Sequence, residues 1–465
     1  MSLRLYDTAT RSVREFVPLV PGQVGIYLCG ATVQGPPHVG HVRSSLCFDV
    51  LRRWLESQGT QVWFVRNVTD IDDKIIHNAG HESIPYWQLA QREERAFTWA
   101  YEVLGCLPPT IEPRATGHVP EMVELIQRLI NAGHAYAVDG DVYFDVRSYA
   151  GYGALSGQRL DDMLASPDVE SSAKKDPHDF ALWKGAKPDE PSWATPWGPG
   201  RPGWHIECSA MASKYLGASF DIHAGGLDLI FPHHENEIAQ SKAAGDGFAN
   251  YWLHNAWVTT AGEKMSKSLG NSLLVSEVVQ RVRPIELRYY LVSAHYRSML
   301  EYSDESVLDA GAGFRRIEGF LQRAVEICGA IEPTIVCSDF LEALDNDLGV
   351  PSALAALFAV VTDGNKLLAG GDSPALRGCA GSVRAMLGIL GVDPMSAPWN
   401  RAVASNEGMR EAVDALVAVA LEQRQAARER KDYAAADTIR DQLTAAGIAI
   451  EDTPEGPRWS LESQG

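Results

Sequence analysis

The strongest constraint on the fold is a strand, a helix and a second strand that follow one another near the amino terminus. Residues 24–30 read VGIYLCG, a short apolar run typical of a buried parallel strand. Apolar residues between Leu46 and Leu55 recur at helical spacing, and residues 61–70, QVWFVRNVTD, are again rich in strand-forming types. Two strands joined by a helix make a parallel βαβ unit, so we predict an α/β fold with a parallel sheet.

The regular alternation of predicted strands and helices is interrupted and then resumes. Residues 82–105 and 119–133 have helical spacing, whereas 135–203 combine short strand patterns with a stretch dense in proline, glycine and tryptophan. We interpret 112–203 as an insertion between two halves of a nucleotide-binding fold. The α/β pattern returns in FDIHAGG and YWLHNAWVTT, and beyond residue 276 almost every segment is helical. The sequence therefore predicts a separate α-helical region at the carboxyl-terminal end.

Composition narrows the class of protein. The 465 residues have 45% hydrophobic content and a formal net charge of −19, as expected of a globular chain with several domains. Such a charge argues against a protein that coats DNA or an anionic membrane, because long-range repulsion slows the approach to a polyanion. The sequence has no pattern of a signal peptide and no continuous apolar run of membrane-spanning length. We therefore expect a cytoplasmic protein.

Two short motifs point to nucleotide chemistry. The motif HVGH, residues 38–41, lies where a strand gives way to a helix, the place in an open α/β sheet where backbone amides attract phosphate. The motif KMSKS, residues 264–268, lies in a glycine-flanked loop. Its two lysines are mobile point charges, suited to an oxygen whose negative charge grows as pyrophosphate leaves. Taken alone, the first motif also fits a histidine-rich helix start and the second a solvated loop.

A mixed set of metal-binding side chains is spread over distant segments. Cys29 ends the first strand, and Cys208 lies in GWHIECSAM. His233 and Glu237 are four residues apart in PHHENEIAQ, where we predict the start of a helix. Two thiols, an imidazole and a carboxylate suit zinc. Spacing alone leaves open the alternative of buried thiols beside a charged helix face, which is the interpretation we give to the other five cysteines.

The order of the two motifs along an α/β chain resembles that of class I aminoacyl-tRNA synthetases. The match is closest to the bacterial cysteinyl-tRNA synthetase family and covers nearly the whole chain. The blocks that carry it read YLCGATVQGPPHVGH, VRNVTDIDDKI, PGWHIECSAM, FDIHAGGLDLIFPHHENEIAQS and KMSKSLGN. One block departs from the family pattern, because Gln34-Gly35 followed by two prolines replaces the usual Tyr-Asp.

The resemblance implies a Rossmann-type class I synthetase catalytic core with a connective insertion, followed by an α-helical C-terminal region. It implies domains at 1–111 (first half of the core), 112–203 (insertion), 204–275 (second half with the KMSKS loop), 276–335 (stem-contact helices), 336–404 (helical bundle) and 405–465 (anticodon-binding domain). The expected partners are ATP, L-cysteine and tRNA(Cys), with neither DNA nor a membrane, and the expected state is a monomer.

The resemblance also assigns residues to roles. It places His38, His41, Lys264 and Lys267 in catalysis, and His38, Gly40, His41, Gly226, Asp228, Lys264 and Lys267 around ATP with its Mg²⁺. It places Thr69, Trp204 and His205 in the substrate pocket, and Cys29, Cys208, His233 and Glu237 around one zinc ion. Arg428, Asp437 and Trp459 would contact anticodon bases, with Trp459 stacking on one of them.

A zinc ion that binds the substrate thiolate would have a clear purpose. Serine differs from cysteine by one atom, and shape alone rejects such an analogue by only about 10- to 200-fold. Zinc prefers a thiolate, formed from a thiol of pKa near 8.5, to an alcohol that holds its proton far more tightly. Selection by ligation would make an editing domain unnecessary, and the insertion at 112–203 is short for one.

Two other functions share parts of this pattern. A related ligase activates cysteine identically but transfers it to an amino-sugar in mycothiol synthesis; it is shorter and lacks a segment like 405–465. A non-catalytic tRNA-binding paralogue would have no physical need for both histidines, both lysines and all four metal-binding side chains. The helix pattern at 421–444 is close to neutral in charge and also fits a salt-bridged solvated helix.

Overall fold

The computed structural model describes residues 2–162, 173–188, 190–260, 263–264, 273–453 and 456–461. The chain divides into two compact units, Met1–Pro394 and Met395–Gly465.

A four-stranded parallel sheet forms the centre of the first unit. Its strands lie in the order β10-β9-β3-β4 and consist of β3 (Gln23–Leu28), β4 (Gln61–Arg66), β9 (Ser219–Gly226) and β10 (Phe248–Asn255). The chain leaves β3 toward β4 on one side, whereas the second half of the core adds β9 and β10 on the other. Between β3 and β9 the strand order therefore reverses, and in open α/β sheets this position is where ligands bind. The predicted α/β class with a parallel sheet is confirmed.

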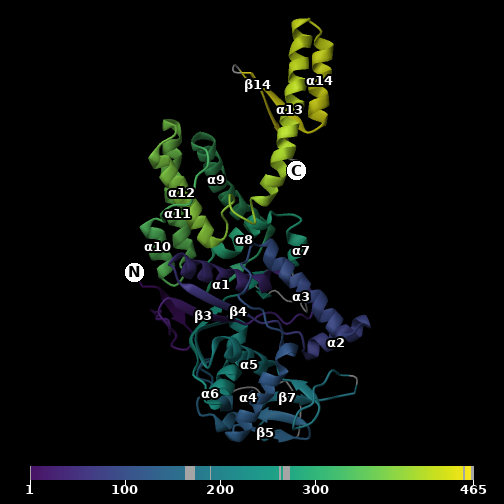
Figure 1. Cartoon of the computed structure of the whole chain (residues 1–465), viewed down its shortest axis with the longest axis vertical. Coiled ribbons are helices and arrows are strands. Elements are labelled where there is room, and N and C mark those ends of the chain that lie inside the picture. The colour runs from purple at the N-terminus through teal and green to yellow at the C-terminus, as the bar shows by residue number, and fades with distance from the viewer. Residues whose placement is uncertain are drawn as a thin grey trace. The chain divides into compact units, whose positions relative to one another are not determined.

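Helices cover both faces of this sheet (Figure 1). Helix α1 (Val39–Ser57) connects β3 to β4 and buries an apolar face that includes Leu46, Leu51 and Trp54. Helix α5 (Trp204–Leu216) packs on the opposite face against β3, β4 and β9, and α6 (Glu235–Ala243) packs against α5 and β10. The sheet is thus a buried layer, as its apolar strands predict.

The helix predicted at 82–105 is observed from Tyr86 to Val103, and a helix that the sequence analysis does not predict precedes it. Helix α2 (Asp73–Glu82) ends at Ser83, whose φ of 55° is left-handed, and α3 (Tyr86–Val103) begins after Pro85. Proline has no amide hydrogen to donate, so it suits a helix start better than a helix interior. The Asp72 carboxylate accepts a hydrogen bond from the Lys74 amide and caps the start of α2.

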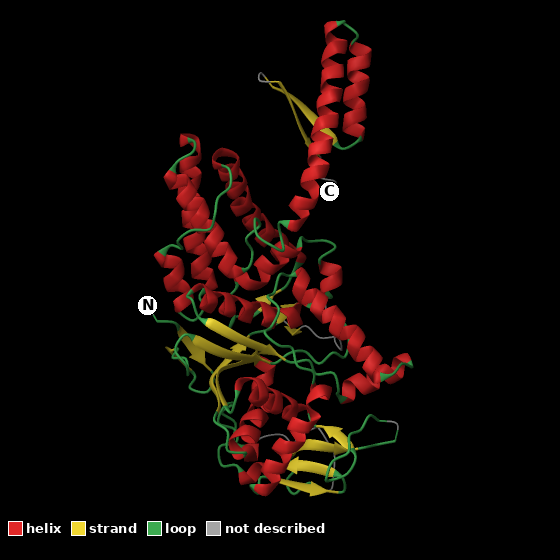
Figure 2. Cartoon of the chain, viewed as in Figure 1, coloured by secondary structure: helices red, strands yellow, loops and turns green. Residues whose placement is uncertain are grey.

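The insertion carries its own small sheet next to a helix (Figure 2). Helix α4 (Val119–Asn131) precedes four antiparallel strands, which are β5 (Ala135–Val138), β6 (Asp141–Phe144), β7 (Phe180–Gly185) and β8 (Gly200–Pro202). Buried Arg201 pairs with Asp73 of α2 and with Glu190, and Lys184 pairs with Asp73 at 2.6 Å. The two ion pairs with Asp73 tie the insertion to the core.

A helical region follows the core in the same unit. Its helices are α7 (Val275–Val278), α8 (Pro284–Ser293), α9 (Asp304–Cys328), α10 (Ser338–Asp345), α11 (Val350–Leu367) and α12 (Pro374–Leu390). By length and hydropathy, one helix among the described residues, Val350–Gly370, could cross a membrane. It carries Asp363 and Lys366 and packs against α9, α10 and α12. It is therefore part of the helical bundle.

Smaller elements complete the two units. Two further sheets of the first unit comprise β1 (Arg4–Asp7), β2 (Ser12–Glu15), β11 (Val258–Thr260), β12 (Glu263–Lys264) and β13 (Leu300–Glu301). Short helical turns occupy 115–118, 146–148, 160–162, 227–229, 230–234 and 368–370. The second unit contains α13 (Arg401–Glu429), α14 (Tyr433–Ala445) and the hairpin β14 (Ile448–Thr453) and β15 (Gly456–Leu461).

Gly30 lies where two backbone segments approach closely. A Cβ atom at this position would overlap the carbonyl oxygen of Asn67. We expect Gly30→Ala to lower the free energy of unfolding by about 1–3 kcal/mol, because backbone must shift to admit the methyl group. Gly80→Ala is the matched control: it lies in α2 with open space around it and should stabilise by about 0.4–1 kcal/mol. Urea unfolding of both variants tests the pair, and equal effects would contradict it.

Candidate active site

The HVGH turn lies at the start of α1, at the carboxyl edge of the sheet. His38 is the N-cap residue, and its amide donates to Nδ1 of His41 at 3.3 Å. The two imidazole rings stack with their centroids 3.5 Å apart. No acidic residue lies in the first turn of α1. The positive end of the α1 helix dipole therefore has no carboxylate from its own first turn beside it, and it suits an anionic ligand.

The chain that follows the KMSKS segment returns to this turn. The amide of Val39 donates to the carbonyl of Leu273 at 3.0 Å, and the amide of Val275 donates to the carbonyl of Pro37 at 3.1 Å. On the other side, Lys264 pairs with Thr259 in the β11–β12 ladder. Lys264, the first residue of the motif, is therefore held in a strand pair, and residues 273–275, beyond the motif, bond the HVGH turn. Lys267 lies outside the described residues.

Arg43 connects the same helix to the β10–β11 junction. Its fully buried guanidinium donates to the carbonyl oxygens of Ala256 at 3.0 Å and Trp257 at 2.6 Å. It also donates to the carbonyls of His295 and Ser298, at 3.3 and 2.7 Å. The helix that begins with HVGH therefore holds the strand that leads to KMSKS.

Four buried side chains from separate elements meet beside the strand reversal. Cys29 directly follows β3, Cys208 belongs to α5, and His233 with Glu237 come from the turn before α6 and from α6 itself. The sulfur atoms of Cys29 and Cys208 lie 3.8 Å apart. Oε1 of Glu237 lies 3.6 Å from the Cys29 sulfur and 3.1 Å from Nε2 of His233.

These distances fit a tetrahedral metal site. Bonds of about 2.3 Å to sulfur and about 2.0–2.1 Å to nitrogen or oxygen give edges of about 3.8 Å between sulfurs, 3.5 Å from sulfur to oxygen and 3.3 Å from nitrogen to oxygen. All four ligand atoms lie within 4.8 Å of one another. The four residues proposed from the sequence are therefore close enough to hold one ion.

A second set of four overlaps the first. Cys29 and Glu237 also lie within reach of His223 and His234. Nε2 of His223 lies 2.9 Å from Oε2 of Glu237, and Nε2 of His234 lies 3.3 Å from the sulfur of Cys29. Sequence reasoning missed both histidines, although they stand inside the quoted blocks FDIHAGG and PHHENEIAQ. The first set has the better chemistry for zinc, because it uses both thiols.

Burial controls the protonation of this cluster. It raises the pKa of the Cys29 and Cys208 thiols, and the neighbouring Glu237 charge raises both further. It also holds the pKa of His233 well below its usual range, so the imidazole stays neutral and able to act as a metal ligand. A divalent cation would favour the thiolates, since its charge reverses the desolvation effect.

Two of the three proposed substrate residues, Trp204 and His205, border His233. The rings of Trp204 and His233 stack with centroids 4.2 Å apart, and Nδ1 of His205 lies 2.9 Å from Nδ1 of His233. Thr69, which follows β4, donates its hydroxyl to Glu207 at 3.0 Å. Burial, followed by the charges of Asp72 and Asp70, raises the pKa of Glu207 well above its usual range. Sequence reasoning missed Glu207, which stands next to Cys208.

The proposed adenosine residues follow β9. Gly226 ends that strand, and Oδ1 of Asp228 accepts a hydrogen bond from Nε1 of Trp257 at 3.0 Å. Trp257 follows β10 and is partly exposed, and the sequence analysis did not single it out. These residues thus lie at the carboxyl ends of the neighbouring strands β9 and β10.

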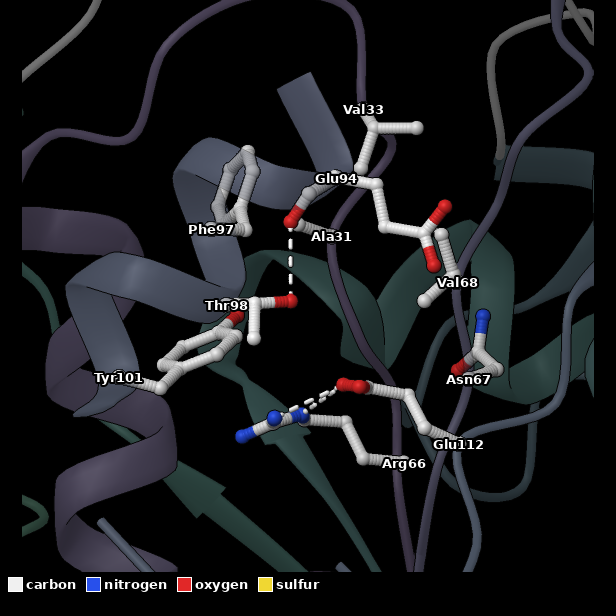
Figure 3. A pocket seen from close by; sticks show the side chains of 10 residues that line it. All are labelled: Ala31, Val33, Arg66, Asn67, Val68, Glu94, Phe97, Thr98, Tyr101 and Glu112. Carbon is white, nitrogen blue, oxygen red and sulfur yellow. Dashed lines mark hydrogen bonds and ion pairs between the residues drawn. The ribbon is translucent and has the colours of Figure 1, made fainter. Parts of the chain in front are cut away.

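A cavity lies behind this edge of the sheet, next to Ala31 and Asn67 (Figure 3). Its volume is about 10 Å³, enough for about one water molecule and too small for ATP or cysteine. Arg66 and Glu112 form an ion pair at its wall, 2.7 Å apart. Its lining residues are Ala31, Val33, Arg66, Asn67, Val68, Glu94, Phe97, Thr98, Tyr101 and Glu112.

The proposed anticodon residues belong to the second unit. Arg428 lies exposed in the last turn of α13, and Asp437 lies exposed in α14, 3.7 Å from Arg440. Trp459 is partly exposed in β15, where it pairs with Ile450 of β14.

Comparison with known proteins gives three matches to family models along the chain. Residues 15–312 match "tRNA synthetases class I (C) catalytic domain", 339–392 match "DALR domain", and 406–459 match "Cysteinyl-tRNA ligase anticodon binding domain". A cysteine–tRNA ligase of Streptomyces avermitilis is 60% identical over 463 residues, which is 99% of each chain. The chain belongs to the cysteine–tRNA ligase family. A member from Nocardioides sp. is 59% identical over 470 residues, 99% of this chain and all of its own.

Membership of the cysteine–tRNA ligase family makes this protein an aminoacyl-tRNA synthetase, an enzyme of the ligase class. Solved structures of other synthetases share the fold. Methionyl-tRNA synthetase of Mycobacterium tuberculosis in complex with methionyl-adenylate aligns with a TM-score of 0.60 at 17% identity, over 83% of this chain and 96% of that one. A putative arginyl-tRNA synthetase from Campylobacter jejuni aligns with a TM-score of 0.52 at 14% identity, over 80% of this chain and 93% of that one. The predicted class I fold is thereby confirmed.

Proposed function

We propose that this enzyme joins L-cysteine to tRNA(Cys) in two steps. The carboxylate of cysteine attacks the α-phosphorus of ATP, which forms cysteinyl-adenylate and releases pyrophosphate. A hydroxyl of the 3′-terminal adenosine of the tRNA then attacks the acyl carbon, and AMP leaves. The observation that carries the proposal is the meeting of Cys29, Cys208, His233 and Glu237 beside β3, the strand that leads into the HVGH turn.

The residues act mainly by position and charge. His38, Gly40 and His41 would hold the phosphates at the start of α1, and Lys264 with Lys267 would follow the charge of the leaving pyrophosphate with its Mg²⁺. Gly226 and Asp228 would border the adenosine. This chemistry needs no covalent enzyme intermediate and no general base for activation, because positioning and electrostatic stabilisation supply the rate.

Cys29, Cys208, His233 and Glu237 would hold one zinc ion per chain. When bound, zinc would supply a borderline-soft Lewis acid that binds the substrate thiol as thiolate. Trp204 and His205 would support the cysteine from the His233 side, because both contact that ring. The Thr69 hydroxyl, which donates to Glu207, would face the substrate with its oxygen lone pair.

An acceptor assay tests this function. The purified protein should charge tRNA(Cys) when ATP, cysteine, the tRNA and an amino-sugar acceptor are all offered. Transfer to the amino-sugar would refute the proposal in favour of the second cysteine ligase. The match of residues 406–459 to an anticodon-binding domain favours tRNA, because an amino-sugar has no anticodon. We further propose that the enzyme acts in the cytoplasm as a monomer.

Trp459 provides a test of anticodon contact. Stacking on an unpaired base is worth about 1–3 kcal/mol, so Trp459→Leu should raise the KM for tRNA by about 5- to 150-fold. Leucine retains apolar bulk in the β14–β15 hairpin but has no aromatic face. ATP–pyrophosphate exchange should be unchanged, and Trp459→Phe should restore most of the tRNA affinity. Equal losses in both assays, or no rescue by phenylalanine, would give Trp459 a purely structural role.

A further inference from the structure

A buried row of hydrogen bonds runs from Cys29 to Thr8, which lies between β1 and β2 in the amino-terminal hairpin, residues 4–15. The sulfur of Cys29 lies 3.3 Å from Nε2 of His234. Nδ1 of His234 lies 2.8 Å from Nε2 of His254, and Nδ1 of His254 lies 2.7 Å from the hydroxyl of Thr8. Both histidines are at most 3% exposed, so water does not replace these partners.

The row has one consistent direction if His234 donates to the sulfur. A neutral imidazole carries one N–H group and one acceptor nitrogen. If Nε2 of His234 donates to Cys29, its Nδ1 must accept from Nε2 of His254. Nδ1 of His254 then accepts from the Thr8 hydroxyl. Each ring thus has one nitrogen that donates and one that accepts, which matches its two short contacts.

The far end of the row is anchored by backbone. The amide of Thr8 donates to the carbonyl of Trp252 at 2.9 Å, and the amide of Trp252 donates to Oδ1 of Asp7 at 3.0 Å. These bonds fix the end of β1 against β10, the strand that carries His254. The Thr8 hydroxyl is therefore held at a defined place, and it can select which nitrogen of His254 bears the proton.

We propose that Thr8 and His254 are positioning residues for the metal centre: they hold His234 in the tautomer that donates an N–H bond to the sulfur of Cys29. Such a bond stabilises the thiolate and orients its lone pairs toward the other three side chains. This inference rests on the proposed zinc site. It gives the amino-terminal hairpin a role in the active site, although none of its residues is among the candidate ligands.

The experiment measures zinc retention by the full-length protein. Wild type and variants are loaded with Zn²⁺, and affinity is obtained by competition with a chromophoric chelator. His254→Phe removes both hydrogen bonds and should weaken zinc binding by about 10- to 100-fold. Thr8→Val should weaken it less, while Thr8→Ser keeps the hydroxyl and should match wild type. His254→Gln, whose amide can still donate to His234, should fall between His254→Phe and wild type.

A matched control separates positioning from loss of packing. His118 is also buried and also makes two hydrogen bonds, to the Arg114 carbonyl and the Tyr215 hydroxyl. His118→Phe makes the same chemical change away from this row and should keep the zinc affinity of wild type. Co²⁺-substituted protein gives a second readout, because the thiolate-to-cobalt absorption band should shift in Thr8→Val and not in Thr8→Ser.

The outcomes distinguish failure of the proposed zinc site from failure of the positioning role of Thr8 and His254. A wild-type protein that binds no zinc would refute the zinc site of the proposed function itself. A wild type that binds one zinc, with a folded His254→Phe of equal affinity, would overturn only the positioning role. Equal weakening by Thr8→Ser and Thr8→Val would also overturn it. The Thr8 pair keeps the test decisive even if His254→Phe fails to fold.

Discussion

Cys208→Ser is expected to reduce the discrimination between cysteine and serine to what the shape of the pocket alone provides. The substitution removes one of the two sulfur donors and leaves the hard hydroxyl in its place, which zinc binds poorly. Loss of a direct ligand should cost more than the roughly 10- to 100-fold that loss of a supporting group costs in metal affinity. Without the ion, only the shape of the pocket separates the substrates, and their kcat/KM ratio should fall to about 10- to 200-fold.

The measurement combines zinc content with exchange kinetics. Elemental analysis should find about one zinc per wild-type chain and much less in the variant, while ATP–pyrophosphate exchange gives kcat/KM for cysteine and for serine. Cys328→Ser is the matched control, because Cys328 is a buried thiol in α9 that belongs to neither candidate set. A Cys208→Ser protein with full zinc content and an unchanged ratio would contradict the proposed ligand set.

The sequence predicts the core of this fold because its signals are local. The alternation in β3, α1 and β4 needs no distant contact to be recognised, since each element shows its own period. Helix α2 is not among the predicted helices, and the left-handed Ser83 and Pro85 separate it from α3, which lies within the predicted range 82–105. Similarly, the ion pair of Arg201 with Asp73 joins segments that lie 128 residues apart, and sequence periodicity does not predict such a contact.

The candidate site also contains both residues that the sequence predicts and residues that it does not. Cys29, Cys208, His233 and Glu237 could be proposed because thiols, imidazole and carboxylate are recognisable as metal-binding types. His223, His234 and His254 were missed, because what matters is which nitrogen faces which partner, and only the fold decides that. His223 and His234 contact Glu237 and Cys29 at 2.9 and 3.3 Å, and His254 contacts His234 at 2.8 Å. Side chains that support a metal ligand by a hydrogen bond have no characteristic spacing in the sequence by which they could be predicted.

Backbone bonds connect the HVGH turn to residues 273–275, which follow the KMSKS motif in the sequence. The amide of Val39 donates to the carbonyl of Leu273 and that of Val275 to the carbonyl of Pro37, so these residues are held against the start of α1. Backbone contacts tolerate changes of side chain, so the departure at Gln34 to Pro37 leaves this connection intact. In the proposed function the phosphates bind at the HVGH turn and the thiol beside Cys29, and both places follow β3 in the chain. A substitution at either place should affect one function and spare the other.

His38→Ala provides the complementary result to Cys208→Ser. His38 caps α1 and stacks on His41 at the place proposed for the phosphates. Loss of one preorganised donor to a developing charge typically costs about 100- to 1000-fold in rate. We therefore expect ATP–pyrophosphate exchange to fall by that factor while zinc content stays at about one per chain, because no candidate metal ligand is changed.

The matched control makes the same histidine-to-alanine change outside the HVGH turn. His77→Ala deletes an exposed imidazole of α2 that contacts the ring of His81. This variant should leave the rate of ATP–pyrophosphate exchange unchanged. Circular dichroism and the unfolding midpoint should be similar in both variants. If His38→Ala retains full exchange activity, or if it loses zinc together with activity, the HVGH turn is not the separate phosphate site that the geometry favours. Retained zinc with lost exchange would show that the HVGH turn serves activation of the carboxylate and is not needed for binding of the zinc.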